Sequence, residues 1–365
     1  MDRLIGVGII GTGVGLRTIL PGLRRTGRAE IVGLSARTQS RAEEVGGPLG
    51  IPLLTADYMK LCEDERIDFI VVSSPNDLHV EHAHAALTSG KHAYLEKPIG
   101  IDAEQGRTIG GYAVGTGRMA LVGHQLRFNP YFRVMRNLIA SGSIGRVYYL
   151  VISQHGSGFT NATRPWTWEF DPERGGGVRL AMGSHMVDLA RYLLRGEAQS
   201  ISAEMDPVHA VRTPDGGPAR ECKVSNFFSA TLTFQGPTTV HVSTTAAAHG
   251  APKFEVIACG ENGDLTFDLS KGLYLHRVGQ EPSAAVSDEV ESEYRHRRPS
   301  SIFSGSFTYF ADEIVDHIAK GSTRIADAAT IEDGIRCLEV LDAALVSGST
   351  GSRELIGPWS SLSAF

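Results

Sequence analysis

The sequence predicts an α/β protein that opens with a doubly wound parallel sheet and continues into a second domain. Apolar runs alternate with helical patterns through the first third of the chain, as the strands and crossover helices of a parallel sheet do. A glycine-rich turn joins the first strand to the first helix. The 365 residues also exceed what one typical core needs, so we expect two domains.

The composition narrows the functional class. Hydrophobic residues make up 42% and charged residues 21%, as in an ordinary globular protein, and the net charge of −6 argues against a general nucleic-acid binder. No apolar run is long enough to span a membrane, and Met1-Asp2-Arg3-Leu4 leads directly into a strand, which predicts no signal peptide. Because the four cysteines are scattered, we expect reduced thiols, no metal site and a cytoplasmic location.

The first strand and turn resemble a dinucleotide-binding unit. Residues 5–10 are apolar without polar alternation, as in a strand buried on both faces. In the following turn, Gly11 allows a tight bend, Gly13 lets the backbone approach a pyrophosphate, and the N–H groups that open the helix face this anion. The third glycine of the Gly-x-Gly-x-x-Gly fingerprint is replaced by Leu16, and Gly15 stands one residue early. The residues predicted to bind the cofactor here are Gly11, Thr12, Gly13 and Val14.

The end of the second strand bears on the choice of cofactor. It lies roughly 20 residues after the turn, where a carboxylate would hold the adenosine ribose of NAD. This chain has Ser35-Ala36-Arg37-Thr38 instead, so no carboxylate repels a 2′-phosphate. Arg37 can pair with that phosphate and Ser35 can donate to it. We therefore favour NADP(H), while NAD(H) stays possible because Arg37 could stack on the adenine or point to solvent.

Two further apolar strands end in polar residues. Residues 69–73 lead into Ser74-Pro75-Asn76, and residues 93–95 lead into Glu96-Lys97-Pro98, where the proline stops the strand ladder. Ligands bind at the carboxyl ends of parallel strands, so the Glu96-Lys97 pair is a candidate for chemistry rather than a surface pair beside a turn. A helix over about 102–114 and a strand over 119–123 complete the sheet.

These motifs resemble the glucose–fructose oxidoreductase / inositol dehydrogenase / MocA (Gfo/Idh/MocA) family, most specifically at Gly90-Lys91-His92-x-x-x-Glu96-Lys97-Pro98. The resemblance implies a two-domain NAD(P)-dependent oxidoreductase that acts on CH–OH groups of sugars, cyclitols or related polyols. It places Lys97 at the nicotinamide, in contact with the reacting substrate oxygen. The cofactor-binding residues that it implies at the two strand ends are Ser74, Pro75, Asn76, His79, Glu96 and Lys97.

The resemblance divides the chain into an NAD(P)-binding Rossmann domain over 1–124 and a substrate-binding and oligomerisation domain over 125–365. It implies an α+β fold for the second domain, with a mostly antiparallel sheet that makes dimer or tetramer contacts, so we expect a homodimer or homotetramer. The alternating segments at 227–234, 239–245, 254–259 and 264–267 fit this sheet. Helices are expected over about 131–141, 307–318 and 328–346, and residues 280–301 are interpreted as a long loop.

Four residues of the second domain are candidates for contact with substrate. The segment 123–130 resembles the family's crossover, so Arg127 and Asn129 are expected to contact the substrate. Trp168 lies upstream of a triple glycine, where it could stack on a sugar ring or equally pack at the domain interface. His185, after the triple glycine, is the residue that the resemblance assigns to the hydroxyl proton.

One residue departs from the family's catalytic pattern. An Asp belongs four residues before the His, where it would orient the imidazole and stabilise its charged form, and this chain has Ala181. Lys97 and His185 could act alone, another group such as Arg179, Tyr131 or a substrate carboxylate could be recruited, or redox activity could be lost. Besides a dehydrogenase, the sequence therefore allows a redox-neutral enzyme with tightly held NAD(P), catalysing epimerisation or elimination, or a catalytically silent NAD(P)-binding regulator.

Overall fold

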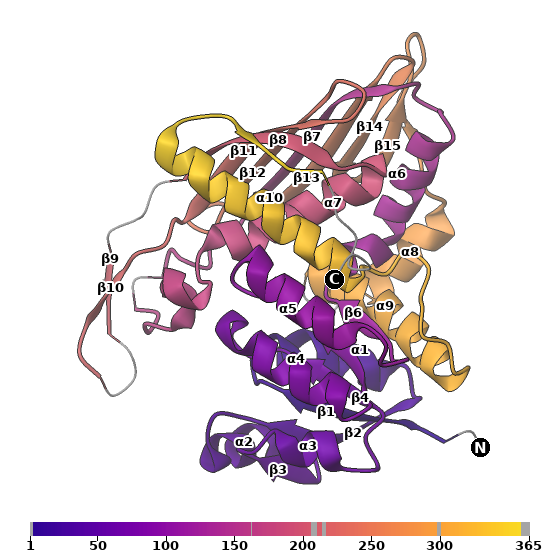
Figure 1. Cartoon of the computed structure of the whole chain (residues 1–365). Coiled ribbons are helices and arrows are strands. Elements are labelled where there is room, and N and C mark those ends of the chain that lie inside the picture. Colours follow the sequence, from indigo (N-terminus) through magenta and orange to yellow (C-terminus); the bar gives the residue numbers. More distant parts are fainter. Residues whose placement is uncertain (1–2, 162, 206–209, 214–216, 298–300, 359–365) are drawn as a thin grey trace. The chain divides into compact units, whose positions relative to one another are not determined.

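A computed structural model describes residues 3–161, 163–205, 210–213, 217–297 and 301–358 (Figure 1). The described residues form two compact units. Unit 1 comprises those within Met1–Asn129 and His296–Ile335, and unit 2 those within Pro130–Arg295 and Arg336–Ser360. Within the described ranges, no helix combines the length and the apolar composition needed to cross a membrane.

Unit 1 contains a parallel sheet of six strands in the order β3-β2-β1-β4-β5-β6. Every residue of β1 is buried, which explains why this strand is an unbroken apolar run in the sequence. From β1 the chain adds strands toward one edge of the sheet, through β2 to β3, and it then returns to add β4, β5 and β6 on the other side of β1. The switch point between β1 and β4 is where open α/β sheets bind ligands. The strands are β1 (Ile5–Ile10), β2 (Ala29–Ser35), β3 (Leu53–Thr55), β4 (Phe69–Val72), β5 (His92–Leu95) and β6 (Ala120–Val122).

Helices connect these strands, and polar side chains cap two of them. Thr38 accepts a hydrogen bond from the Arg41 N–H at the start of α2, and Asp102 accepts one from the Gln105 N–H at the start of α5. The helices are α1 (Leu20–Arg25), α2 (Gln39–Gly46), α3 (Met59–Glu63), α4 (His79–Thr88) and α5 (Ala103–Ala113).

Unit 1 also includes α9 (Ile302–Ala319), which the sequence-based division assigns to the second domain. Phe310 of α9 stacks on Phe128 with ring centroids 4.0 Å apart, and Phe307 meets the edge of Tyr94 at 5.6 Å. The Val122 N–H of β6 donates to the Ala329 carbonyl over 3.0 Å. The segment groups with unit 1 because its aromatic face and its backbone complete the core and the sheet there.

Unit 2 is built on a nine-stranded sheet in the order β16-β15-β14-β13-β7-β12-β11-β8-β17. Its pairs are antiparallel except β7 with β12, so the predicted fold class is confirmed for both units. The strands are β7 (Val147–His155), β8 (Ala198–Glu204), β11 (Phe227–Phe234), β12 (Thr238–Thr245), β13 (Lys253–Gly260), β14 (Gly263–Asp268), β15 (Gly272–His276), β16 (Ser283–Ala284) and β17 (Glu354–Leu355), with β9 (Ala210–Arg212) and β10 (Arg220–Cys222) as a separate pair.

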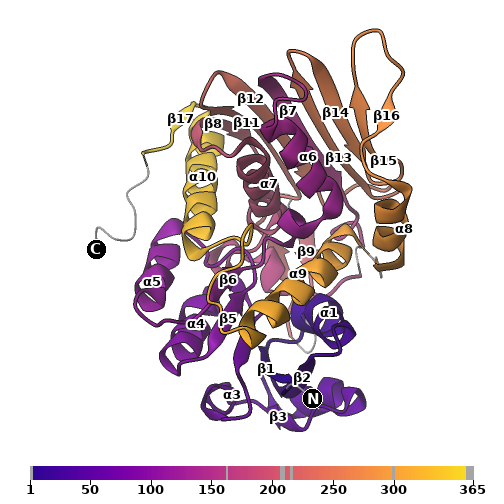
Figure 2. The ribbon, with the colours of Figure 1, turned by 90° about the vertical axis from the view of Figure 1, so that its right-hand side faces the viewer.

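Two neighbouring helices, α6 (Pro130–Ala140) and α7 (Ser184–Leu194), pack on this sheet, and α10 (Ile331–Thr350) lies on the same side (Figure 2). The predicted loop at 280–301 is wrong over most of its length, because β16 and the helix α8 (Asp288–Arg297) lie there. Residues 298–300 of that prediction fall outside the described residues. Three acids in the first turn of α8 suit a helix N-terminus, and Tyr294 anchors the helix on the Tyr131 ring at 5.0 Å. A single buried anchor gives little periodicity, so the sequence did not reveal this helix.

Candidate active site

Three glycines shape the turn after β1, and each has its own reason. Gly11 has φ +108°, and a Cβ there would lie 2.4 Å from the Ser73 carbonyl oxygen. A Cβ at Gly15 would lie 2.3 Å from Ser73 Oγ, so Gly15 provides the close packing that the missing third glycine would give. No atom lies within 4 Å of a Cβ built at Gly13. The turn therefore leaves open space where a pyrophosphate would approach the backbone, and it fits a dinucleotide.

The end of β2 lies beside this turn. The Gly11 N–H donates to the Ser35 carbonyl over 2.9 Å, and the Ala36 N–H donates to the Thr55 carbonyl over 3.0 Å. Ser35 and Ala36 are buried, whereas Arg37 is exposed. Three residues are predicted to bind the adenosine ribose. Of these, Arg37 has a solvent-exposed side chain, and Ser35 contributes mainly a backbone contact.

Two histidines of α4 hold the end of β4. His82 Nδ1 lies 2.8 Å from Ser74 Oγ. The ring of His79 is fully buried, with Nε2 2.9 Å from the Ser74 carbonyl oxygen and Nδ1 2.9 Å from the Pro98 carbonyl oxygen. Sequence reasoning assigned His79 to the cofactor. The structure instead directs both ring nitrogens at the backbone, so any contribution of His79 to cofactor binding is indirect.

Burial lowers the pKa of His79 to about 4, although the contacts with the Ser74 and Pro98 carbonyls oppose this shift. A neutral ring carries one N–H, so it donates to one of the two carbonyls at neutral pH.

We predict that His79 makes the protein less stable in mild acid. In the unfolded chain the histidine takes up a proton as pH falls below 6.5, whereas the folded protein resists protonation until about pH 4. The stability contribution is present above pH 6.5 and is lost between pH 6.5 and 4, by about 3 kcal/mol at most. Urea unfolding at several pH values should show that the free energy of unfolding falls less steeply with decreasing pH in His79→Gln than in the wild-type protein. The same pH dependence in both proteins would contradict the assignment.

The end of β5 combines a buried acid with a partly exposed lysine. Glu96 is buried and accepts a hydrogen bond from the Tyr94 hydroxyl over 3.0 Å, which the sequence analysis missed although Tyr94 lies two residues away on the same strand face. Burial raises the pKa of Glu96, and the neighbouring Lys97 opposes this shift. Lys97 is partly exposed, and its bond to the buried Pro98 is cis. This turn places a cation at the ligand-binding edge of the sheet.

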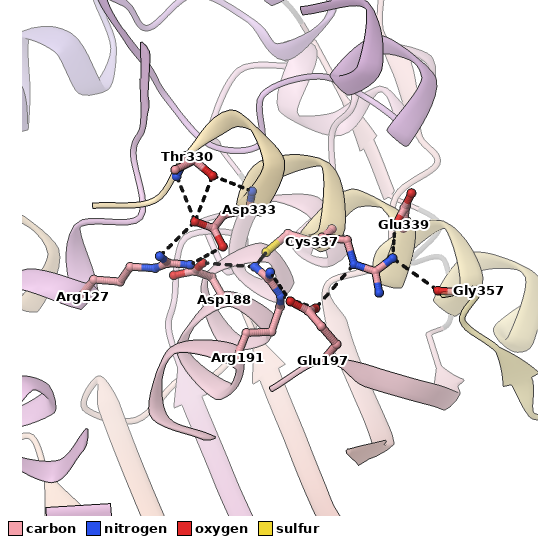
Figure 3. A network of polar contacts seen from close by, with 10 residues as sticks. Arg127, Asp188, Arg191, Glu197, Thr330, Asp333, Cys337, Glu339 and Gly357 are labelled. Carbon is pink, nitrogen blue, oxygen red and sulfur yellow. Dashed lines mark hydrogen bonds and ion pairs between the residues drawn. The ribbon is translucent and has the colours of Figure 1, made fainter. Parts of the chain in front are cut away.

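The two residues predicted in the crossover have other partners. Arg127 is buried and pairs with Asp333 through two nitrogen–oxygen contacts of 3.1 Å, while the Thr330 N–H donates to the same carboxylate over 2.9 Å (Figure 3). Asn129 is fully buried, and its Nδ2 donates to Ser306 Oγ over 3.0 Å. Within unit 1, both side chains hold the returning segment, so the expectation that they bind substrate finds no support in these contacts.

In unit 2, His185 follows a glycine-rich turn. Gly177 has φ +95°, and its N–H donates to the Glu169 carbonyl over 3.0 Å. A π-helical turn, Arg179–Gly183, then leads into α7, where His185 is buried in the first turn. Ala181 lies in the π-helical turn and is exposed. This position therefore has room for a side chain but supplies no carboxylate to orient the imidazole.

The candidate substitutes for the missing carboxylate are engaged elsewhere in unit 2. Arg179 donates from Nη1 to the Leu341 carbonyl over 2.9 Å, and the Tyr131 hydroxyl donates to Glu291. Burial raises the pKa of Tyr131 well above its ordinary value. Trp168 is half-buried in a short 3-10 turn.

An ion-pair chain that the sequence did not reveal steadies the helix of His185. Arg191 of α7 binds Glu197 at 2.6 Å, and Glu197 lies 3.5 Å from Arg336 of α10 (Figure 3). Because Arg336 is far from Glu197 in the sequence, no local spacing could indicate the pair.

The predicted residues fall into two groups. Unit 1 brings the glycine turn, residues 35–37, residues 74–76, His79 and the Glu96-Lys97 pair to the carboxyl ends of four strands, β1, β2, β4 and β5. Unit 2 holds Trp168 and His185.

Comparisons with known proteins show the family of both parts of the chain. Residues 5–124 match the oxidoreductase family with an NAD-binding Rossmann fold, and residues 132–266 match the GFO/IDH/MocA C-terminal domain. An inositol 2-dehydrogenase of Rhizobium meliloti is 26% identical over 87% of this chain and 89% of its own length. A D-xylose 1-dehydrogenase (NADP(+)) of Haloferax volcanii is 27% identical over 64% of this chain and 67% of its own length.

Among solved structures, levoglucosan dehydrogenase in complex with NADH and levoglucosan superposes with a TM-score of 0.85 at 19% identity, over 98% of this chain and 100% of that one, and shows the same fold. The alignments of this chain with three further relatives cover 76%, 41% and 57% of the lengths of those relatives. The two family matches together span most of the chain and include the glycine turn and Lys97 in one domain and His185 in the other. The chain belongs to the Gfo/Idh/MocA family of oxidoreductases.

Proposed function

We propose that this protein is an NADP(H)-dependent oxidoreductase that transfers hydride between the nicotinamide and a hydroxyl or keto carbon of a sugar, cyclitol or sugar derivative. The observation that carries the proposal is the open glycine turn at the sheet's switch point, together with Lys97 at the end of β5, two strands away. The named relatives act on inositol and D-xylose, which supports a polyhydroxylated substrate.

Each residue group has a defined task in this proposal. Backbone N–H groups of residues 11–14 bind the pyrophosphate, and the ends of β4 and β5 hold the nicotinamide half. A bound nicotinamide supplies or accepts hydride at its C4 atom. Lys97 binds the reacting oxygen and stabilises its developing negative charge, and His185 takes or returns the hydroxyl proton. Trp168 would stack on the apolar face of the sugar ring.

The preference for NADP(H) rests on Arg37. Its side chain is exposed directly after β2, and the neighbouring Ser35, Ala36 and Thr38 bring no negative charge. A charge-assisted pair between Arg37 and the 2′-phosphate would favour NADPH, and the protein has no carboxylate among residues 35–38 that would repel this phosphate.

We expect calorimetric titration to show tighter binding of NADPH than of NADH. Arg37→Ala should weaken NADPH binding by about 10-fold or more and leave NADH binding within about threefold, because only NADPH carries the phosphate. Arg41→Ala is the matched control, since Arg41 is an exposed arginine nearby that pairs with Glu44 at 2.9 Å. Equal binding of the two cofactors, or tighter binding of NADH, would refute the NADP(H) assignment.

A redox-neutral enzyme that retains its nicotinamide is a second candidate, and a silent NAD(P)-binding regulator, which Ala181 favours, is a third. Analysis of the nucleotide released when the purified protein is denatured, in oxidised and reduced form, separates the first of these from a dehydrogenase, because a redox-neutral enzyme would keep its cofactor through purification. A regulator would bind cofactor without turning over any sugar or cyclitol.

We also propose that the protein works as a homodimer or homotetramer in the cytoplasm. Residues of β11 alternate between buried and half-buried, so one face of the unit 2 sheet is packed and the other is available to a second copy. The four cysteines are free, which suits a reducing compartment.

A further inference from the structure

His79 bridges two turns that the strand ladder does not reach. At the carboxyl ends of β4 and β5, the last backbone hydrogen bond between the two strands runs from the Glu96 N–H to the Val72 carbonyl over 2.8 Å. Beyond it the two chains separate, and Pro98 has no N–H with which to continue the ladder. The buried His79 ring stands between the Ser74 and Pro98 carbonyl oxygens at 2.9 Å from each, so its single N–H donates to one of them and the enclosed ring sets the spacing to the other.

The bridge lies at the residues on which the proposed reaction depends. Pro98 follows Lys97 directly, and Ser74 begins the turn predicted to bind the nicotinamide half of the cofactor. The ring is rigid and fully enclosed, so it fixes the separation of the two turns more narrowly than a flexible side chain would. His82 also contacts Ser74, with Nδ1 2.8 Å from its hydroxyl oxygen, but among the described residues His82 makes no hydrogen bond to the turn after β5.

We propose that His79 is a positioning residue that holds the Glu96-Lys97-Pro98 turn against the end of β4 and thereby fixes where Lys97 meets the substrate oxygen. The role given to Lys97 rests on the proposed function, whereas the bridge itself does not. Both ring nitrogens of His79 face backbone carbonyls, so this role involves no contact with substrate or cofactor. Its loss therefore acts through the geometry of Lys97, and should lower kcat more than cofactor affinity.

Three variants test the bridge. His79→Leu fills similar space without donating a hydrogen bond, and His79→Gln keeps an amide whose two N–H donors can serve the carbonyls. His84→Leu is the matched control, because His84 lies on the same helix but is exposed. Should His79→Leu fail to fold, His79→Asn replaces it, since its shorter side chain is expected not to span the distance between the two carbonyls as the imidazole ring does.

The first readout needs no substrate. Hydrogen exchange followed by mass spectrometry should show at least about tenfold faster exchange over residues 92–101 in His79→Leu, with recovery in His79→Gln and no change in His84→Leu. Unchanged exchange in His79→Leu, or equal acceleration in His84→Leu, would overturn the proposal.

The second readout is kinetic. In His79→Leu we expect kcat to fall by about 10- to 100-fold while the Kd for NADPH changes by less than about threefold, with kcat recovering in His79→Gln. A fall in cofactor affinity as large as the fall in kcat would mean that His79 serves the cofactor site and not Lys97. If the wild-type protein turns over no sugar or cyclitol, the proposed function fails, and the exchange measurement still decides whether the bridge exists.

Discussion

Replacing Lys97 with methionine is expected to lower kcat by about 10²- to 10⁴-fold, the range over which positioned acid–base and electrostatic groups contribute to catalysis. Methionine preserves the length of the side chain and removes the charge that would stabilise the reacting oxygen. NADPH binding should stay within about threefold, because the pyrophosphate and adenosine contacts come from the other strand ends. Steady-state kinetics with the best sugar or cyclitol substrate, alongside cofactor titration, would measure both quantities.

Lys91→Met provides the control for this substitution within the same sequence motif. Lys91 donates from Nζ to the Asp64 carbonyl over 2.9 Å and to the Ile67 carbonyl over 2.8 Å, so it joins the segments that precede β4 and β5, at the amino ends of these strands. Its loss should lower the melting temperature slightly and leave kcat unchanged. A Lys97→Met protein that retained kcat within tenfold of wild type would show that another group stabilises the oxygen.

Gly11→Ala is expected to destabilise the protein by about 2–4 kcal/mol and to abolish measurable cofactor binding. An alanine at φ +108° costs about 1–2 kcal/mol, and its Cβ would also stand 2.4 Å from the Ser73 carbonyl oxygen, which belongs to backbone that cannot move aside cheaply. Denaturant unfolding of the variant measures the first effect, and calorimetric titration with NADPH measures the second.

Gly13→Ala separates folding from binding at the same turn. No atom lies within 4 Å of a Cβ at this position, so stability should stay within about 0.5 kcal/mol of wild type. The added methyl would occupy the space in which a pyrophosphate approaches the backbone, so NADPH affinity should fall by about tenfold or more. Undiminished NADPH binding by Gly13→Ala would mean that the cofactor does not lie against this turn.

The sequence predicts the sheet of unit 1 well because strands buried on both faces appear as continuous apolar runs. The run at residues 5–10 and the strand of β1 coincide for this reason. The sequence did not reveal α8, which has one buried anchor, Tyr294, and a polar surface otherwise. The grouping of α9 with unit 1 could not be foreseen either, because the periodicity of a helix shows which face is buried but not which sheet that face packs against.

In the candidate site, too, the residues that the sequence predicts differ physically from those that it does not. Backbone requirements leave a local trace, so Gly11 and Gly13 can be recognised from their spacing alone. Long-range partners leave none: Arg127 was expected to reach the substrate because its segment resembles the family's crossover, and nothing near it in the sequence points to its partner Asp333. His79 was singled out by its motif, but only the structure shows that its two ring nitrogens meet the carbonyls of two different turns. Whether Trp168 and His185 contact substrate stays a prediction.

The hydrogen bond from Val122 to Ala329 and the aromatic face of α9 join residues that are synthesised far apart in time. A ribosome delivers all six strands of the first sheet long before it delivers α9 and Ala329. Until then the rings of Tyr94 and Phe128 lack the partners that cover them in the finished protein. The nascent N-terminal third must therefore wait, incompletely closed, through the synthesis of roughly 170–200 further residues, a delay of about 10–40 s at ordinary elongation rates. During that interval it is the part of the chain on which a chaperone would act.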